Sequence, residues 1–382
     1  MIDRRLFLSC AGIGAGAMLI APRMALAAVE SDRRFVFIIQ RGAADGLNIV
    51  MPYADPAYAR LRGELAGDMA AATKLDGTFA LHPALAETAR MFAQRQALFV
   101  HAVASPYRDR SHFDGQNVLE TGGTQPYQAK DGWLNRLVGM MPGAGDDAIA
   151  ITSTVPMALR GARQVTSYAP SALPQPSDDL LLRAGRLYAE DPQLHPLWAA
   201  ALEARGLAAG TGARQDPASL GRLTASFLTK PNGPRIAMLE TGGWDTHSGQ
   251  QGRLAAQLRA LDTLLAALRD GLGPAWGKTT VLVATEFGRT AAVNGTGGTD
   301  HGTGSVAWLV GGAVRGGRIV SDWPGLGAGQ LYQDRDLKPT MALDALIAGV
   351  AAESMALDPQ HVARTVFPLA APVRPVTGLI AA

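Results

Sequence analysis

The sequence predicts an α/β fold in which a mostly parallel central sheet is flanked by helices. Short apolar runs recur along the chain, and segments with helical periodicity separate them. Strands that alternate with helices are typical of a parallel sheet covered on both faces. The 382 residues include 44 glycines, while aromatic residues make up only 6%. This composition fits an α/β protein whose function is located on its loops.

Six segments are predicted to be buried strands, because each is short, apolar and bounded by polar or glycine-containing sequence. In chain order they are residues 34–40, 97–103, 148–151, 235–239, 279–285 and 305–310. A long helical pattern with leucines on one face lies between the predicted strands at 235–239 and 279–285. These leucines are Leu254, Leu258, Leu261, Leu264, Leu265 and Leu268.

The stretch from about residue 154 to residue 233 differs from the rest because it is richer in Pro, Ala and Arg. Helical pieces are expected around 177–187 and 196–204. We interpret the stretch as a helical insertion over the sheet, so that residues 28–382 form one α/β domain.

Residues 1–27 are predicted to be a twin-arginine signal peptide. They contain the Arg4-Arg5 pair, a Gly/Ala-rich apolar run at 11–21 and a small-residue cleavage site at 25–27. The run is shorter than the roughly 20 residues that span a bilayer, so no stable membrane anchor is expected. The protein is therefore expected in the periplasm or outside the cell, with the twin-arginine translocase as its partner during export.

The single cysteine and the charge exclude several classes of protein. Cys10 lies within the predicted leader, so the remaining 355 or so residues contain no cysteine. Disulfides, thiolate metal ligands and a cysteine nucleophile are thereby excluded. The net charge of +2 gives no indication of nucleic acid as a partner.

Polar residues that directly follow predicted strands form the candidate site, because ligands of open α/β sheets bind at the carboxyl ends of the strands. These residues are Asp45, Asp245, His247, Glu286, Asp300 and His301. Carboxylates together with imidazoles suit zinc, manganese or a similar divalent ion. The pattern predicts a divalent ion at this site.

A candidate nucleophile follows the second predicted strand. Ser111 is expected at the start of a helix, where free backbone N–H groups and the helix dipole favour an anion. A metal that lowers its proton affinity would make this hydroxyl a nucleophile. Arg108 and Arg289 are candidates to neutralise an oxyanion, because a guanidinium matches phosphate or sulfate with paired donors.

Each candidate also has a structural interpretation. Asp45 or Asp300 could cap a turn beside glycine, and Ser111 could be only a helix N-cap. His112 could belong to the core or support the site from behind. The shared location after strands favours the functional interpretation. Three further histidines are expected to be structural, namely His82, His195 and His361.

Five motifs together resemble the twin-arginine-exported bacterial family catalogued as domain of unknown function 1501. They are residues 41–48, 105–108 with 111–114, 243–247, 285–290 and 298–302. The resemblance covers nearly the whole chain after the leader. That family is grouped by distant similarity with alkaline phosphatases and sulfatases, so the resemblance implies a core sheet, two metal sites and a nucleophile at a helix start.

The resemblance also implies roles for individual residues. By order along the chain, Asp45 resembles the first-strand metal ligand and Ser111 the nucleophile. Asp245 and His247 resemble the Asp/His pair of one metal, and His301 resembles the late histidine ligand of the same metal.

The sequence departs from this pattern at Glu286-Phe287, where phosphatases of this kind carry an Asp-His pair. Phe287 cannot bind a metal. One site is therefore expected to be nearly complete, whereas the second, left with Asp45 and Glu286, would be weak, oxygen-only or vacant. This departure puts two-metal phosphoryl transfer in doubt.

Two functions remain open at this point. The first is a metal-dependent periplasmic hydrolase of phosphate or sulfate esters, whose substrate is a small anionic ester or an extracellular polymer. The alternative is a non-catalytic exported protein that retains the fold and at most one metal site. A third possibility is that the protein matures or carries a metal cofactor or an extracellular polymer for a partner. No residue in the sequence favours it.

Overall fold

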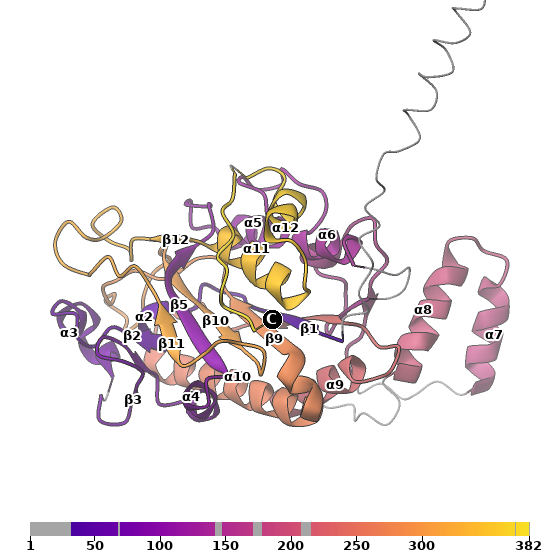
Figure 1. Cartoon of the computed structure of the whole chain (residues 1–382), viewed down its shortest axis with the longest axis horizontal. Helices are drawn as coiled ribbons and strands as arrows, with labels where there is room; N and C mark the ends of the chain where they lie inside the picture. The colour runs from indigo at the N-terminus through magenta and orange to yellow at the C-terminus, as the bar shows by residue number, and fades with distance from the viewer. Residues whose placement is uncertain are drawn as a thin grey trace, which may run out of the picture. The chain divides into compact units, whose positions relative to one another are not determined.

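A nine-stranded sheet lies at the centre of the fold (Figure 1). A computed structural model of the chain describes residues 32–67, 69–141, 147–170, 178–207, 215–370 and 372–381, so the predicted signal peptide lies outside the described residues. Eight strands follow one another in space in the order β11 (Arg318–Val320), β5 (Ala97–Ala104), β10 (Ser305–Val310), β9 (Thr279–Ala284), β1 (Arg34–Gln40), β8 (Ile236–Thr241), β6 (Ala148–Ala150) and β7 (Thr166–Ser167). The ninth strand, β12 (Met341–Ala342), pairs with β5.

The sheet is mostly parallel, as the sequence predicts. Strand β1 pairs in parallel with β8 and β9, and β6 pairs in parallel with β7 and β8. Strand β10 is the exception, because it runs antiparallel to both β9 and β5. The six predicted strands all form and are buried, with ends within two residues of those expected.

Successive residues of β1 point into two different cores. Phe35, Phe37 and Ile39 belong to one core, whereas Val36 and Ile38 belong to the other. This alternation follows from the two-residue period of a strand. Helices cover both faces of the sheet (Figure 1). On the first face lie α5 (His112–Thr121), α6 (Trp133–Gly139), α11 (Leu343–Ser354) and α12 (Pro359–Val366); on the second lie α4 (Ala86–Ala93), α9 (Pro217–Leu228) and α10 (Gln250–Leu272).

Helix α10 carries the predicted leucine face. All six leucines of the pattern are buried in the second core, where α9 also contributes Leu223 and Phe227. Between residues 154 and 233, the described residues form η2 (Met157–Leu159), β7, α7 (Asp178–Tyr188), α8 (Leu194–Leu207) and α9. Helices α7 and α8 correspond to the predicted helical pieces.

Smaller elements follow β1. A separate three-stranded sheet has the order β2 (Val50–Met51), β4 (Ala80–Leu81), β3 (Thr73–Lys74). Short helices in the same part of the chain are α2 (Gly46–Ile49), α3 (Tyr58–Arg62) and η1 (Gly63–Ala66); η3 (Gly273–Lys278) precedes β9. No helix within the described ranges is long and apolar enough to cross a membrane.

Candidate metal centre

Four segments bring polar side chains to one place. Asp245 follows β8, Glu286 follows β9, and His301 lies in the loop that joins β9 to β10. His112 is the first residue of α5, which follows β5. Because β10 runs antiparallel to its neighbours, the loop before it lies at the edge where β5 and β9 end.

His112, Asp245 and His301 form a compact cluster. One ligand atom from each lies within 4.8 Å of the others. The Asp245 Oδ2 atom is 3.4 Å from His112 Nε2, and Asp245 Oδ1 is 3.2 Å from His301 Nε2. Two imidazoles thus face the two oxygens of one carboxylate.

His247 adjoins the same cluster. Its Nε2 atom lies 3.0 Å from Asp245 Oδ1 and 3.0 Å from His301 Nε2. Its other ring nitrogen, Nδ1, lies 3.0 Å from Asp300 Oδ1. The structure therefore brings together four of the residues that sequence analysis singled out: Asp245, His247, Asp300 and His301.

Each of the three histidines has an oxygen acceptor at Nδ1. The acceptors are Glu286 Oε1 for His112 at 2.8 Å, the Arg110 carbonyl for His301 at 2.9 Å, and Asp300 Oδ1 for His247 at 3.0 Å. An oxygen acceptor at Nδ1 requires the ring proton there, so a neutral ring presents the Nε2 lone pair. All three lone pairs are directed to the Asp245 carboxylate or to one another.

This donor set fits a divalent metal ion. His112 Nε2 is buried and has no hydrogen-bond partner among the described residues. The lone pairs of His247 and His301 face each other at 3.0 Å, which is unfavourable unless a proton or a cation lies between them. Imidazole and carboxylate ligands, with the far ring nitrogen held by an oxygen acceptor, are typical of zinc and related ions.

Glu286 supports the cluster from a fully buried position. Its Oε1 atom accepts hydrogen bonds from the Gly42 backbone N–H at 2.8 Å and from Gln116 at 3.1 Å, besides its contact with His112. Burial raises the pKa of Glu286, but these hydrogen bonds outweigh it and leave the pKa lowered. The hydrogen bond that His112 Nδ1 donates to Glu286 is the main cause of the raised pKa of His112.

Arg289 holds Asp245 from the other side. Its side chain is fully buried; Nη1 donates to Asp245 Oδ1 at 2.6 Å, while Nε and Nη2 donate to the hydroxyl and carbonyl of Thr299. Burial raises the pKa of Asp245, yet the Arg289 hydrogen bond and charge more than compensate and lower it. All three guanidinium nitrogens are thus used within the protein.

Asp45 is not brought into the cluster. Its side chain caps α2 by accepting the Leu47 N–H at 3.1 Å, and it pairs with the fully buried Arg62. Gln250 Nε2 also donates to it. The Asp45 oxygens therefore face donors rather than other metal ligands.

A hydrogen-bond chain nevertheless joins Asp45 to the cluster. Gln250 binds Asp45 through its amide nitrogen and accepts from the Thr299 hydroxyl at 2.6 Å through its amide oxygen. Thr299 in turn accepts from Arg289, which binds Asp245. Gln250 and Thr299 were not among the residues expected at the site, although Thr299 lies in the motif at 298–302.

Ser111 occupies the N-cap position of α5, as predicted, but makes no side-chain capping hydrogen bond. It is half-buried, and its backbone N–H donates to the Tyr107 hydroxyl at 3.2 Å. Arg108 Nη1 donates to the carbonyls of Ser105 and Tyr107. The catalytic roles of Ser111 and Arg108 stay predictions.

Phe287 packs against the cluster instead of adding a ligand. Its ring stacks on His112 with centroids 5.1 Å apart and lies 5.4 Å from His301. Helix α5 has Gly115 at this contact, where a Cβ atom would come within 2.9 Å of the Phe287 ring. The residue that departs from the phosphatase pattern is therefore an apolar wall of the site.

Gly42 allows the loop after β1 to approach Asp245. Its φ of +119° lies in a region that other residues rarely adopt, and a Cβ atom there would be 2.7 Å from the Asp245 backbone nitrogen. Glycine is thus required both by the backbone conformation and by the close approach.

The sequence also matches a family model described as "Protein of unknown function (DUF1501)" over residues 32–367. The chain belongs to this family. Of the motifs that carry the resemblance to DUF1501, those containing His112, Asp245, Glu286 and His301 meet at the cluster. No curated protein matches the sequence.

Several solved structures are similar to this DUF1501 protein at low sequence identity. The zinc complex of the C-terminal periplasmic domain of EcEptC from Escherichia coli has 8% identity and a TM-score of 0.40, covering 74% of this chain and 73% of that one. Alkaline phosphatase from the Antarctic bacterium TAB5 has 10% identity and a TM-score of 0.38, covering 89% and 99%. A putative sulfatase from Bacteroides thetaiotaomicron has 9% identity and a TM-score of 0.37, covering 91% and 73%.

Sequence analysis of this DUF1501 protein left His112 open between a structural position, in the core or behind the site, and a functional one. The structure places it in the cluster with Asp245 and His301. Its position directly after Ser111, at a predicted helix start, was an available indication. The three histidines expected to be structural lie elsewhere: His195 on α8 and His361 on α12 are exposed, and His82 follows β4.

Proposed function

We propose that this chain is a metal-dependent hydrolase of phosphate or sulfate esters that acts in the periplasm or outside the cell. The observation that carries the proposal is the set of three histidines whose Nε2 atoms converge on the Asp245 carboxylate. In this proposal His112, Asp245 and His301 bind one divalent ion, and His247 lies beside them as a further ligand. Export rests on the composition of residues 1–27.

The residues around these ligands orient them. Glu286 keeps the proton of His112 on Nδ1, and Asp300 does the same for His247, so that both rings present Nε2. Arg289 fixes one oxygen of Asp245. These three residues are therefore positioning residues in this proposal.

Ser111 is the proposed nucleophile. A divalent ion bound at the cluster would polarise the ester and lower the pKa of a nearby hydroxyl. The Ser111 hydroxyl oxygen forms a bond to phosphorus or sulfur, the bond to the ester oxygen breaks, and the alcohol leaves with a proton. Water then cleaves the serine ester and releases phosphate or sulfate. The start of α5 and Arg108 favour the anion at this place.

One observation favours a second function. Phe287 closes the position at which a second metal would need a histidine, so a protein that retains a single metal without turnover is the alternative. The ligand cluster alone is compatible with both functions. Metal content and hydrolysis must therefore be measured on the same preparation.

The test uses the purified protein with zinc or manganese added, measuring bound metal by mass spectrometry and hydrolysis of aryl phosphates and aryl sulfates. Ser111→Ala is expected to lower kcat/KM by more than about 100-fold, a loss of roughly 2.7 kcal/mol, while leaving the metal content unchanged. His301→Ala is expected to lose the metal. Ser153→Ala and His361→Ala, at exposed positions, serve as matched controls.

The outcomes separate the two functions. Stoichiometric metal without hydrolysis of any ester supports the non-catalytic alternative. Hydrolysis that Ser111→Ala leaves unchanged removes the serine from its proposed role. Metal content that His301→Ala leaves unchanged overturns the metal site itself.

A further inference from the structure

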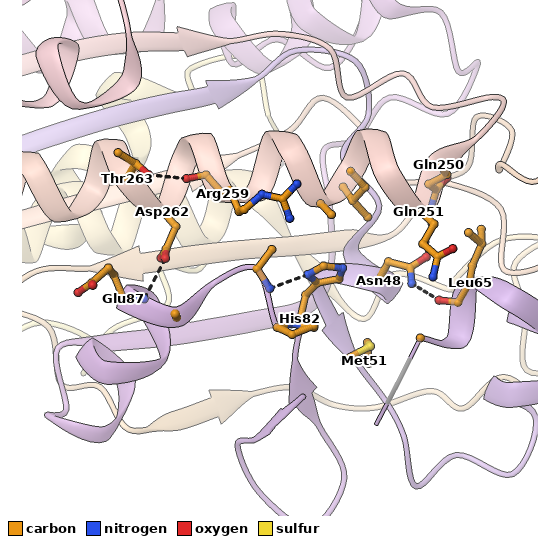
Figure 2. Close-up of a pocket in the computed structure, with 16 residues that line it drawn as sticks. Asn48, Met51, Leu65, His82, Glu87, Gln250, Gln251, Arg259, Asp262 and Thr263 are labelled. Carbon is orange, nitrogen blue, oxygen red and sulfur yellow. Dashed lines mark hydrogen bonds between the residues drawn. The ribbon is translucent and has the colours of Figure 1, made fainter. Parts of the chain in front are cut away.

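A cavity of about 650 Å³ lies between α10, η1 and the segment that follows β4 (Figure 2). It contains none of the residues of the metal cluster. Its volume lies within the range of pockets that bind small molecules, about 300–1,000 Å³. The chemistry of its lining determines which ligand it would recognise.

The lining is mainly apolar. Met51, Leu65 and Leu254 are themselves buried and line the cavity. Pro83 and Ala255 are more exposed and form further apolar wall. Such a lining favours an apolar ligand body over a fully hydrated one.

Two hydrogen-bond donors face this cavity. Arg259 belongs to α10 and His82 to the segment after β4, and both residues line the cavity (Figure 2). The His82 Nδ1 atom accepts a hydrogen bond from the Ala84 backbone N–H at 3.1 Å, so in a neutral ring the proton is on Nε2. Burial, and to a smaller extent the charge of Arg259, lowers the pKa of His82 to about 4, which keeps the ring neutral near pH 7.

The carboxylates of the same cavity already have partners. Asp262 accepts from the backbone N–H groups of Glu87 and Thr88 at 2.9 and 2.8 Å, at the start of α4. The Glu87 side chain pairs with Arg90 and lies 3.6 Å from Arg269. By contrast, within the part of the chain that the structure describes, the Arg259 guanidinium and His82 Nε2 have no acceptor. Among the ionisable side chains of the lining, those without a partner in the described part of the chain are thus donors, one of them cationic.

We infer that this cavity binds an amphiphilic monoanion, with its carboxylate at Arg259 and His82 and its apolar chain along Met51, Leu65 and Leu254. The arrangement suits such a molecule because Arg259 is exposed whereas the apolar residues are buried. The charged head would keep contact with water while the chain leaves it. This site is separate from the proposed ester hydrolysis and requires no metal.

The test is isothermal titration of the purified protein with decanoate. We expect one site per chain, and no comparable heat from acetate, which lacks the chain, or from decyltrimethylammonium, which carries the opposite charge. Arg259→Gln is expected to weaken decanoate binding about tenfold or more. His82→Asn, which keeps an acceptor for the Ala84 N–H, is expected to weaken it by a smaller factor.

Three further variants locate the binding site. Arg253→Gln changes an exposed arginine of the same helix that does not line the cavity, and should leave the affinity within about twofold. Ala255→Trp fills the cavity and should abolish binding, with the thermal unfolding midpoint showing that the variant folds. His301→Ala should bind decanoate like the wild type.

Absence of decanoate binding overturns the inference, as does binding that Arg259→Gln and Ala255→Trp leave unchanged. Loss of binding in His301→Ala would place decanoate at the metal cluster and would also overturn it. Because the readout is heat of binding to the metal-free protein, failure of ester hydrolysis would leave the result interpretable.

Discussion

Asp45 and Asp245 have similar places in the fold but different surroundings. Each lies in the loop after a parallel strand of the central sheet, Asp45 after β1 and Asp245 after β8, and these two strands are neighbours. Asp45 faces the donors of Arg62, Gln250 and the Leu47 N–H. Asp245 faces the Nε2 atoms of three histidines, with a single arginine behind it.

The difference shows that the partners of a carboxylate, rather than its place after a strand, determine what it can bind. A buried carboxylate surrounded by donors is already neutralised, and a metal ion would have to displace Arg62. A carboxylate that faces three imidazole nitrogens beside a single arginine can still share a metal ion with those nitrogens. We therefore expect Asp45 to contribute to stability and Asp245 to metal binding, and three measurements test this contrast.

The largest expected effect is on stability. Asp45→Asn leaves the fully buried Arg62 without its counter-charge, and removing one partner of a buried ion pair costs about 3–5 kcal/mol. Urea unfolding should show a loss of this size, while the metal bound per folded molecule stays the same. Asp322→Asn, at an exposed position, should change the unfolding free energy by less than about 0.5 kcal/mol.

The opposite result would remove the contrast between the two residues. If Asp45→Asn lost the metal but kept the stability of the wild type, Asp45 would be a ligand, as the resemblance to phosphatases implies.

The sequence could place both aspartates after strands but could not identify their partners. The buried strands are recognisable from apolar runs such as residues 34–40 and 279–285, because such runs are local. The partners are distant: Arg62 is 17 residues from Asp45, and Gln250 is 205 residues from it. No local pattern records which side chain of a distant segment will face a given carboxylate.

His112 illustrates the same limit within the cluster. Its position at the start of α5 was predictable, whereas its contact with Glu286 spans 174 residues and depends on the packing of α5 against the end of β9. From the sequence, a structural position of this histidine and a position in the site were equally open. The fold supplies the answer by placing its Nε2 opposite Asp245.

The antiparallel direction of β10 is indicated by the sequence of the loop that precedes the strand. A parallel connection between neighbouring strands needs a crossover, usually a helix. The loop between β9 and β10 contains no helix and is rich in glycine, from Gly288 to Gly304. An antiparallel pairing follows, and it places His301 beside Asp245.

The second measurement concerns the support of the metal ligands. Glu286→Gln retains the shape of the side chain but replaces the charged acceptor of the His112 Nδ1 proton by a neutral one. Loss of such support usually lowers metal affinity about 10- to 100-fold. Competition with a chelating metal indicator should show a decrease in this range. Glu240→Gln, at the end of β8 and paired with Arg41, provides the control and should keep the affinity of the wild type.

A Glu286→Gln variant that binds metal like the wild type would show that His112 is not oriented through its Nδ1 atom. The cluster would then reduce to Asp245, His247 and His301, and the buried Nε2 of His112 would need another explanation.

The smallest expected effect concerns pH, and it tests whether proton and metal compete for one atom. The Glu286 hydrogen bond raises the pKa of His112 above its ordinary value. In the metal-free protein, the charged ring therefore adds stability that is fully present below the ordinary histidine pKa of about 6.5 and is lost as the pH rises through the folded-state pKa. Metal affinity should change in the opposite direction, because binding requires the Nε2 lone pair.

Nuclear magnetic resonance titration of the His112 ring, with and without metal, measures this competition directly. The pKa in the metal-free protein should be lower in Glu286→Gln than in the wild type, because the charged acceptor is gone. At Asp45 no such competition is expected, since its partners are Arg62, Gln250 and a backbone N–H rather than histidines. If the His112 ring had the same pKa in the wild type and in Glu286→Gln, Glu286 would not determine that pKa. The contrast between the two aspartates would then depend on Asp245, His247 and His301 alone.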